Sequence, residues 1–211
     1  ERGTFESDVT LARLARDKFL LITGSAQVTR DADWIGRNSP QGAHVALTDV
    51  TGAWTVLSLM GPHSRKLLQK VSPADFTNAA FPFGTIREVS IGYATVLASR
   101  RTYMGELGWE LYVPTTELRI VYLSVMAAGA PHGIRDFGMF ALNSLRMEKA
   151  YRGFGSELTN ELSLPEAGMD RFASARKTDY VGREGVEKRR LAGTEGRIAY
   201  LNVDATELDI L

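Results

Sequence analysis

The order of the elements predicted between residues 17 and 91 constrains the fold of this chain most. An apolar run ends in a glycine and precedes a helix that serine can cap, two further strand segments flank a Thr-Gly-Ala turn, and a Gly-Pro pair begins a second helix. The predicted ranges are strands at 17–24, 44–50, 54–60 and 85–91, with helices at 25–37 and 61–71. Strand, helix, strand, strand, helix and strand in this order are typical of a split βαβ, ferredoxin-like unit.

The remaining chain continues the mixture of helices and strands. Strands are predicted at 94–100, 109–113 and 197–203, helices at 117–128, 136–149 and 182–191, and a loop at 151–166. We therefore expect an α+β fold with antiparallel sheets and flanking helices, organised as two interleaved units. Arg146 and Glu148 are expected to form a solvated or structural ion pair, and the basic run at 188–190 a solvated helix face.

Composition excludes several classes of protein. The 211 residues include 25 basic and 25 acidic side chains, and a nucleic-acid binder would normally show a basic excess. The longest uncharged apolar stretch, near residues 120–131, is shorter than the roughly 20 residues of a membrane span. The absence of cysteine excludes disulfides and thiolate metal sites, and three histidines make a histidine-rich metal site unexpected. We therefore expect no nucleic acid, no membrane and no metal.

The common catalytic motifs are also absent. No G-x-G-x-x-G follows a strand, and the chain contains no G-x-x-x-x-G-K-[ST], no H-E-x-x-H and no G-x-S-x-G. These absences argue against a dinucleotide fold, a P-loop, a zincin and a serine hydrolase of the nucleophile-elbow type.

The segment at residues 103–114 contains the densest group of chemistry-bearing side chains. Two glycines bracket Glu106, and the alternation that follows places Glu110 on the strand face opposite Trp109. One interpretation is a bulged hairpin that enters an edge strand with solvated acids. The other is that Glu110 lies in a pocket, where its two oxygens match a flat ring with an N–H beside an amino group.

Tyr-Met-Gly-Glu-Leu-Gly-Trp-Glu-Leu at residues 103–111 resembles the Y-x-G-E-x-G-[FW]-E motif of the folate-binding aminomethyltransferase superfamily, which includes the glycine cleavage T-protein. The segments at 132–149, 154–161, 165–168 and 181–184 resemble the folate domain of sarcosine and dimethylglycine dehydrogenases. This resemblance implies a truncated T-protein-like fold. Its expected parts are a discontinuous folate-binding unit at 1–16 and 130–180, a ferredoxin-like unit at 17–129, and the start of a C-terminal β-barrel at 181–211.

The resemblance also implies roles for five residues. Asp8, within the G-x-x-x-x-D-x-T pattern, matches the family's key aspartate and is the expected catalytic residue. Tyr103 and Glu110 match the residues that contact the pterin. Thr10, on the same strand face as Asp8, and Gly24, in a turn that brings backbone close to folate, complete the expected folate site.

Two departures from the T-protein pattern favour the dehydrogenase branch. Leu142 stands where the T-protein has arginine, and Glu106 and Leu107 stand where T-proteins have Glu-Asp. The implied function is transfer of a methylene unit from an N-methyl amine, through an iminium, to tetrahydrofolate. FAD would belong to a flavin domain that is absent from this chain. The expected location is the cytoplasm, or the mitochondrial matrix in a eukaryote.

The sequence is also compatible with other functions. One is a non-catalytic folate-binding module like the iron–sulfur assembly factor of the same superfamily, although its relatives carry a cysteine motif that this chain lacks. Another is a demethylase or methyltransferase that uses a sulfonium or methoxy donor, and a third is an inert scaffold. The ends of the chain are expected to be cuts within a longer protein, so the isolated chain is expected to self-associate or to be marginally stable.

Overall fold

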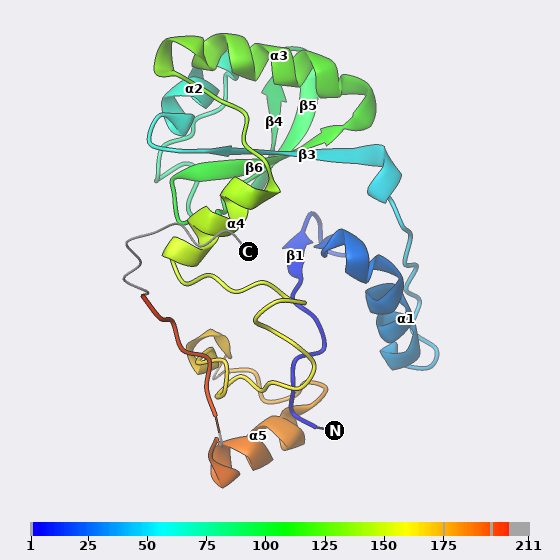
Figure 1. Ribbon diagram of the computed structural model, residues 1–211. Helices are drawn as coiled ribbons and strands as arrows, with labels where there is room; N and C mark the ends of the chain where they lie inside the picture. Colours follow the sequence, from blue (N-terminus) through cyan, green and yellow to red (C-terminus); the bar gives the residue numbers. More distant parts are fainter. Residues whose placement is uncertain (1, 175, 195, 203–211) are drawn as a thin grey trace. The chain divides into compact units, whose positions relative to one another are not determined.

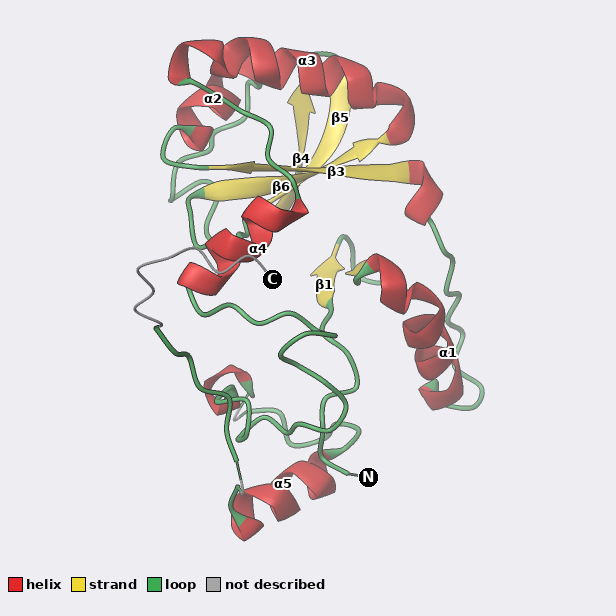
Figure 2. Ribbon diagram, viewed as in Figure 1, coloured by secondary structure: helices red, strands yellow, loops and turns green. Residues whose placement is uncertain are grey.

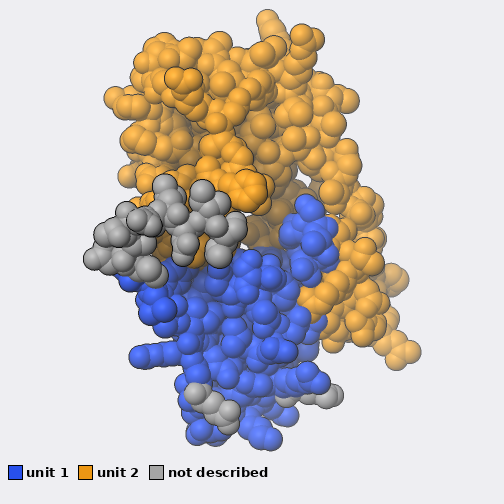
Figure 3. Space-filling model, viewed as in Figure 1, with its two compact units in different colours: residues 1–9, 23–27, 152–211 blue, residues 10–22, 28–151 orange. Residues whose placement is uncertain are grey.

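The computed structural model describes residues 2–174, 176–194 and 196–202, and the chain divides into two compact units. Unit 1 comprises residues 1–9, 23–27 and 152–211, and unit 2 comprises residues 10–22 and 28–151 (Figure 3). Each unit is therefore discontinuous in the sequence. The functional boundaries expected at 16/17, 129/130 and 180/181 stay a prediction, because compactness does not test which segments bind folate.

Unit 2 is built on a four-stranded antiparallel sheet with the strand order β3-β6-β5-β4. Helices α2 and α3 pack on one side of this sheet, and α4 lies on the other side (Figure 1). Strand β6 is interior, because it pairs with β3 on one side and β5 on the other. The bounds are β3 Trp54–Met60, α2 Ser64–Val71, β4 Ile86–Ile91, β5 Ala94–Ser99, β6 Gly108–Pro114, α3 Leu118–Gly129 and α4 Met139–Glu148.

The core of unit 2 lies between the sheet and helices α2 and α3. Trp109, Leu111 and Val113 alternate along β6 and have no exposed surface. Phe76 and Phe81 meet the Trp109 ring edge-on, with ring centroids 5.4 and 6.1 Å away. Burial of one such side chain contributes about 1.5–3 kcal/mol. The side chains on this face of β6 are thus part of the core, and those on the opposite face do not contribute to it.

Two strand predictions need correction. Residues 44–50 are exposed and form no strand, so the predicted hairpin with 54–60 is wrong, and β3 pairs with β6 instead. The apolar run at 17–24 does form β2 (Phe19–Ile22), but β2 pairs with β1 (Thr10–Arg13) in a separate two-stranded sheet. The strands predicted between residues 17 and 91 therefore do not share one sheet. The α+β class with antiparallel sheets is confirmed.

The predicted helices form close to their expected positions. The first is the 3-10 turn Ser25–Gln27 followed by α1 (Val28–Asn38), and α4 begins three residues later than the prediction. Among the residues described, none of the helices combines the length and the apolar character needed to cross a membrane.

Unit 1 consists mainly of loops and turns (Figure 2). Its regular elements in the described residues are η1 Ser25–Gln27, η5 Asp170–Phe172 and α5 Arg183–Ala192. Gly3 has a φ of +70°, and a Cβ there would lie 2.3 Å from the carbonyl oxygen of Gly185, so this close approach of two backbones requires glycine. The strand expected at 197–203 is not present in residues 197–202, and residue 203 lies outside the described residues.

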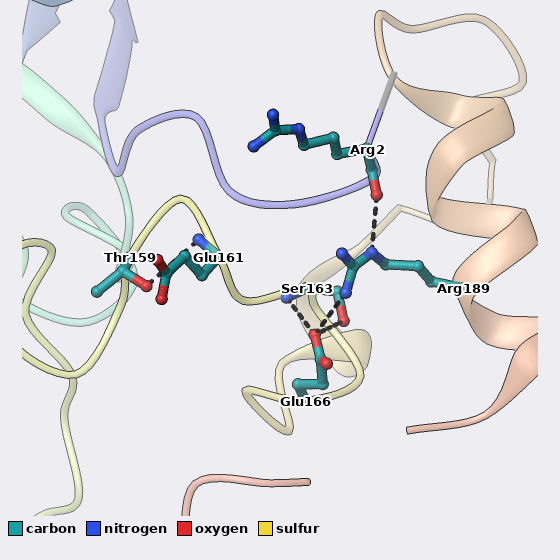
Figure 4. Close-up of polar contacts among 6 residues, drawn as sticks. All are labelled: Arg2, Thr159, Glu161, Ser163, Glu166 and Arg189. Atoms are coloured by element: carbon teal, nitrogen blue, oxygen red, sulfur yellow. Dashed lines mark hydrogen bonds and ion pairs between the residues drawn. The ribbon is translucent and has the colours of Figure 1, made fainter. Parts of the chain in front are cut away.

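A polar cluster around Glu166 connects three segments of unit 1 (Figure 4). Its Oε2 accepts hydrogen bonds from the Ser163 hydroxyl and amide at 2.5 and 2.7 Å and from Arg189 Nη1 at 3.0 Å. The Ser163 bonds, followed by the charge of Arg189, lower the pKa of Glu166. Arg189 Nε also donates to the carbonyl of Arg2 at 2.7 Å. The expectation that residues 188–190 form a solvated helix face is therefore wrong for Arg189, while Lys188 and Arg190 are exposed.

Candidate functional site

The two glycines of the motif lie at the end of the loop before β6 and at the start of β6, where a side chain fits poorly. Gly105 has a φ of +74°, and a Cβ there would lie 2.6 Å from Lys149 Cγ. A Cβ on Gly108 would lie 2.0 Å from Met60 Sδ. Lys149 Nζ in turn lies 3.8 Å from Glu106 Oε1. The positive φ of Gly105 and the packing around Gly108 thus explain both glycines, and Glu106 has a cationic partner in Lys149, which directly follows α4.

Glu110 lies at the centre of the sheet, on the face opposite the core. It is half-buried on β6, directly across from Ser58 of β3 and Ser99 of β5. The predicted opposition of Glu110 and Trp109 is confirmed, since Trp109 is fully buried on the other face. The interpretation of this segment as an edge strand is wrong, because β6 is an interior strand. Of its two acids, Glu106 is exposed, as that interpretation expected, and Glu110 is half-buried.

Tyr112 fixes one oxygen of the Glu110 carboxylate. Its hydroxyl donates to Glu110 Oε2 at 2.6 Å. Burial raises the pKa of Tyr112, the hydrogen bond and the charge of Glu110 raise it further, and nearby Arg101 opposes the shift. The hydroxyl therefore remains a donor at neutral pH. The hydrogen bonds of the described residues leave Glu110 Oε1 available to accept from a ligand.

Arg101 connects Thr10 to the neighbourhood of Glu110. Its Nη1 donates to Thr10 Oγ1, and its charge acts on Tyr112. Thr10 is the first residue of β1 and is half-buried. The structure therefore brings Thr10, Arg101, Tyr112 and Glu110 into one polar region of unit 2, while the contact of Thr10 with folate stays a prediction.

Tyr103 lies in the same unit beside a second tyrosine. The ring centroids of Tyr103 and Tyr151 are 6.4 Å apart, with the planes tilted by 34°. The carbonyl of Tyr151 accepts from Arg146 Nη1 at 2.9 Å, and Asn143 Oδ1 accepts from two further nitrogens of that guanidinium. Arg146 is only 4% exposed, so the solvated form of the ion pair expected between Arg146 and Glu148 is wrong for Arg146, and the structural form stays a prediction.

Asp8 and Gly24 belong to unit 1, whereas Thr10, Tyr103 and Glu110 belong to unit 2. Asp8 is exposed and precedes β1 in the sequence. The Gly24 carbonyl accepts from the Gln27 amide at 2.8 Å. A Cβ on Gly24 would meet only the Gln27 side chain, at 3.9 Å, so local packing does not require glycine there. The convergence of Asp8 with Glu110 stays a prediction.

The sequence interpretation missed two members of this polar region. Tyr112 could have been found, because residues two apart on a strand share a face and Glu110 was already singled out. Arg101 carried no such signal, since its bond to Thr10 joins residues that are 91 positions apart.

The antiparallel sheet and its flanking helices define an α+β fold that a solved structure shares. The glycine cleavage aminomethyltransferase T from Bartonella henselae has a similar fold, with a TM-score of 0.76 and 21% identity over 92% of this chain and 51% of that chain. The family model of the GCVT N-terminal domain matches residues 1–177. The chain therefore belongs to the GCVT N-terminal domain family.

Relatives of the dehydrogenase branch are similar over almost the whole chain. Mitochondrial dimethylglycine dehydrogenase from Mus musculus is 35% identical over 99% of this chain and 24% of its own length. Mitochondrial sarcosine dehydrogenase from Mus musculus is 38% identical over 97% of this chain and 24% of its own length. The chain thus spans about a quarter of these relatives, and the family resemblance predicted from its motifs is confirmed.

Proposed function

We propose that this chain binds a reduced folate on the sheet face that carries Glu110. The observation that supports this is the Glu110 carboxylate itself, half-buried on an interior strand, oriented by Tyr112 and open at Oε1. A pterin ring offers an N–H beside an amino group, and these donors match the two oxygens of a carboxylate. Oε2 keeps accepting capacity beside its bond to Tyr112, so the arrangement fits such a ligand. Tyr103 would line the pterin.

The proposed reaction is capture of a methylene unit by tetrahydrofolate. One folate nitrogen forms a bond to the iminium carbon and passes its proton to the donor amine, which leaves with its bonding electron pair. The second folate nitrogen then bonds to the same carbon and releases one proton as 5,10-methylenetetrahydrofolate closes. Asp8 would stabilise the positive charge of the iminium and assist the proton movement. Holding both reactants in one site favours this transfer over loss of formaldehyde to water.

The relatives support the proposal that this chain acts as one segment of a larger dehydrogenase-like protein. Their names describe mitochondrial dehydrogenases of dimethylglycine and sarcosine, of which this chain spans about a quarter. We propose that an N-methyl amine is oxidised by a flavin domain elsewhere in the parent protein, and that this segment receives the product. In a eukaryote the expected location is the mitochondrial matrix.

Calorimetric titration with 5-formyltetrahydrofolate tests the binding role. Glu110→Ala should weaken binding at least about tenfold, because a charge-assisted hydrogen bond contributes roughly 1.5–3 kcal/mol and 1.4 kcal/mol is one decade. Glu106→Ala is the matched control, since Glu106 lies in the same motif but pairs with Lys149. Equal affinity of the Glu110 variant and the wild-type chain would remove the pterin role.

Asp8→Ala separates catalysis from binding. We expect it to retain most of the affinity for 5-formyltetrahydrofolate and to lose one-carbon transfer in the intact parent protein. A transfer rate that Asp8→Ala leaves unaffected would remove the catalytic role of Asp8. A wild-type parent protein that binds folate but transfers no one-carbon unit would favour the non-catalytic folate module instead.

Self-association of the isolated chain is a further part of the proposal. Helix α4 exposes Met139 and Phe140, which are 74% and 97% accessible. Exposed apolar groups of this size favour association. Light scattering after size exclusion should show a mass above that of the monomer, and a shift towards the monomer for Phe140→Gln. A wild-type chain that stays monomeric at all concentrations would contradict the expectation.

A further inference from the structure

Two arginines meet at the buried Trp109, on the helix-covered side of the sheet. Arg65 comes from α2 and Arg100 directly follows β5. Their guanidinium carbons lie 5.8 and 5.6 Å from the centre of a Trp109 ring. Both side chains are half-buried. Glu110 is on the opposite face of β6, so this pair lies outside the proposed folate site.

Both guanidinium groups converge on one neutral acceptor. Arg65 Nη2 and Arg100 Nη2 donate to Asn78 Oδ1 at 2.6 and 2.8 Å. Each arginine is also anchored to backbone, Arg65 Nε to the carbonyl of Phe76 at 2.8 Å and Arg100 Nη1 to the carbonyl of Phe81 at 2.6 Å. The two cations are therefore held in fixed positions before any ligand arrives.

The positive charge of this pair is uncompensated within the part of the chain that the structure describes. The ion pairs among those residues include neither Arg65 nor Arg100. Burial, and then the like charge of Arg65, lower the pKa of Arg100. Two guanidinium groups that share a carboxamide oxygen repel each other, and an anion between them would remove that repulsion.

We propose that Arg65, Arg100 and Asn78 form a binding site for a dianionic phosphate group. Two fixed positive charges match the charge of a dianion, and arginine forks match phosphate oxygens in geometry. Arg65 Nη1 and Arg100 Nε donate to no acceptor among the described residues, and both remain available to the ligand. Asn78 is exposed, so solvent reaches this cluster. The ligand can be free phosphate or the phosphate of an ester.

Titration of the full 211-residue chain at about pH 8, where a phosphate ester is fully ionised, tests this site. The probes are inorganic phosphate, O-phosphoserine and acetate, with binding followed by calorimetry. We expect saturable binding of phosphate at least tenfold tighter than that of acetate. Comparable binding of O-phosphoserine would identify the phosphate of an ester as a ligand, and binding of inorganic phosphate alone would identify the free ion.

Asn78→Asp is the decisive variant, because it supplies a permanent carboxylate between the two arginines without removing either of them. It should raise the melting temperature and weaken phosphate binding at least tenfold. Arg87→Gln is the matched control, since Arg87 also stacks on an aromatic ring, 5.3 Å from the centre of Phe81, but does not bind Asn78. It should leave phosphate affinity unchanged.

Three results would overturn the proposal. The first is a folded wild-type chain that shows no saturable phosphate binding. The second is an Asn78→Asp chain that binds phosphate as tightly as the wild type. The third is equal loss of phosphate affinity in the Arg87 and Asn78 variants, which would indicate a diffuse charge effect. The Glu110→Ala variant should bind phosphate normally, so this test is independent of the folate assignment.

Discussion

The two units of the molecule are stabilised by different forces. Unit 2 contains a continuous cluster of buried apolar side chains between its sheet and helices. In the described residues of unit 1, the buried apolar side chains are Leu158, Ala167 and Val186, and polar contacts such as the Glu166 cluster connect its loops. Net contributions of single hydrogen bonds are smaller than those of buried apolar side chains. Unit 1 should therefore be the part that responds first to pH and to small backbone changes.

The positions of the tryptophans allow the stabilities of the two units to be measured separately. Trp34, Trp54 and Trp109 all belong to unit 2, so tryptophan fluorescence reports on that unit alone. Hydrogen exchange of the backbone amides follows both units separately. Each variant below can thus be assigned to the unit that it affects.

The largest effect is expected from Leu68→Ala. Leu68 is fully buried on α2 in the core of unit 2, and its truncation leaves a cavity. The free energy of unfolding should fall by about 2–5 kcal/mol, measured by denaturant titration with tryptophan fluorescence. Leu123→Ala is the control, because Leu123 is 52% exposed on α3 and its loss should change stability by less than about 0.5 kcal/mol. Equal effects of the two substitutions would contradict this core assignment.

A smaller effect, confined to unit 1, is expected from Gly3→Ala. The new Cβ would collide with the Gly185 carbonyl at 2.3 Å, in a backbone conformation that already disfavours side chains. The cost should be about 1–3 kcal/mol, seen as faster amide exchange in α5 with unchanged tryptophan fluorescence. Gly155→Ala is the control, because Gly155 also has a positive φ, of +92°, but has open space around it. Its effect therefore gives the cost of the backbone strain without the collision. Equal exchange in both variants would show that the close approach is unimportant.

The smallest effect is the pH response of Glu166. Because hydrogen bonds from Ser163 lower its pKa in the folded state below the ordinary value of 4.5, its contribution is complete above about pH 4.5. That contribution is lost as the pH falls towards the folded pKa, so acid should loosen unit 1 before unit 2. Glu166→Gln should cost about 1 kcal/mol at neutral pH and flatten the response in amide exchange. Glu187→Gln, which breaks the exposed pair with Arg183, should change little. If the Glu166→Gln variant keeps the acid response of the wild type, protonation of Glu166 is not the cause of that response.

The sequence predicted those elements of unit 2 whose pattern is local. Strand-like segments located β3, β4, β5 and β6, and the alternation along β6 correctly opposed Glu110 to Trp109. The prediction failed at residues 44–50, because a turn between two strand-like segments suggests a hairpin but does not establish the pairing partner. Strand β3 instead pairs with β6. Because β6 is distant from β3 along the chain, no local pattern predicts this pairing.

Recognition of the candidate site depended on a motif and not on periodicity. Spacing alone left Glu110 open to two interpretations, and the resemblance to the aminomethyltransferase family favoured the pocket. Contacts such as Arg101 with Thr10 and Arg65 with Asn78 were not predicted, because they depend on how distant segments pack. The role of Asp8 likewise depends on an arrangement that no local pattern encodes.

The most direct test of the central claim compares two ligands on one variant. Tyr112 donates to the carboxyl oxygen at position 110, so in Glu110→Gln the amide oxygen would be engaged and the NH₂ group would face the donors of a pterin. Calorimetric titration of this variant should therefore show at least about tenfold weaker binding of 5-formyltetrahydrofolate than the wild type. Its affinity for p-aminobenzoylglutamate, which lacks the pterin, should be unchanged. Equal losses for both ligands, or no loss for either, would contradict recognition of the pterin by Glu110.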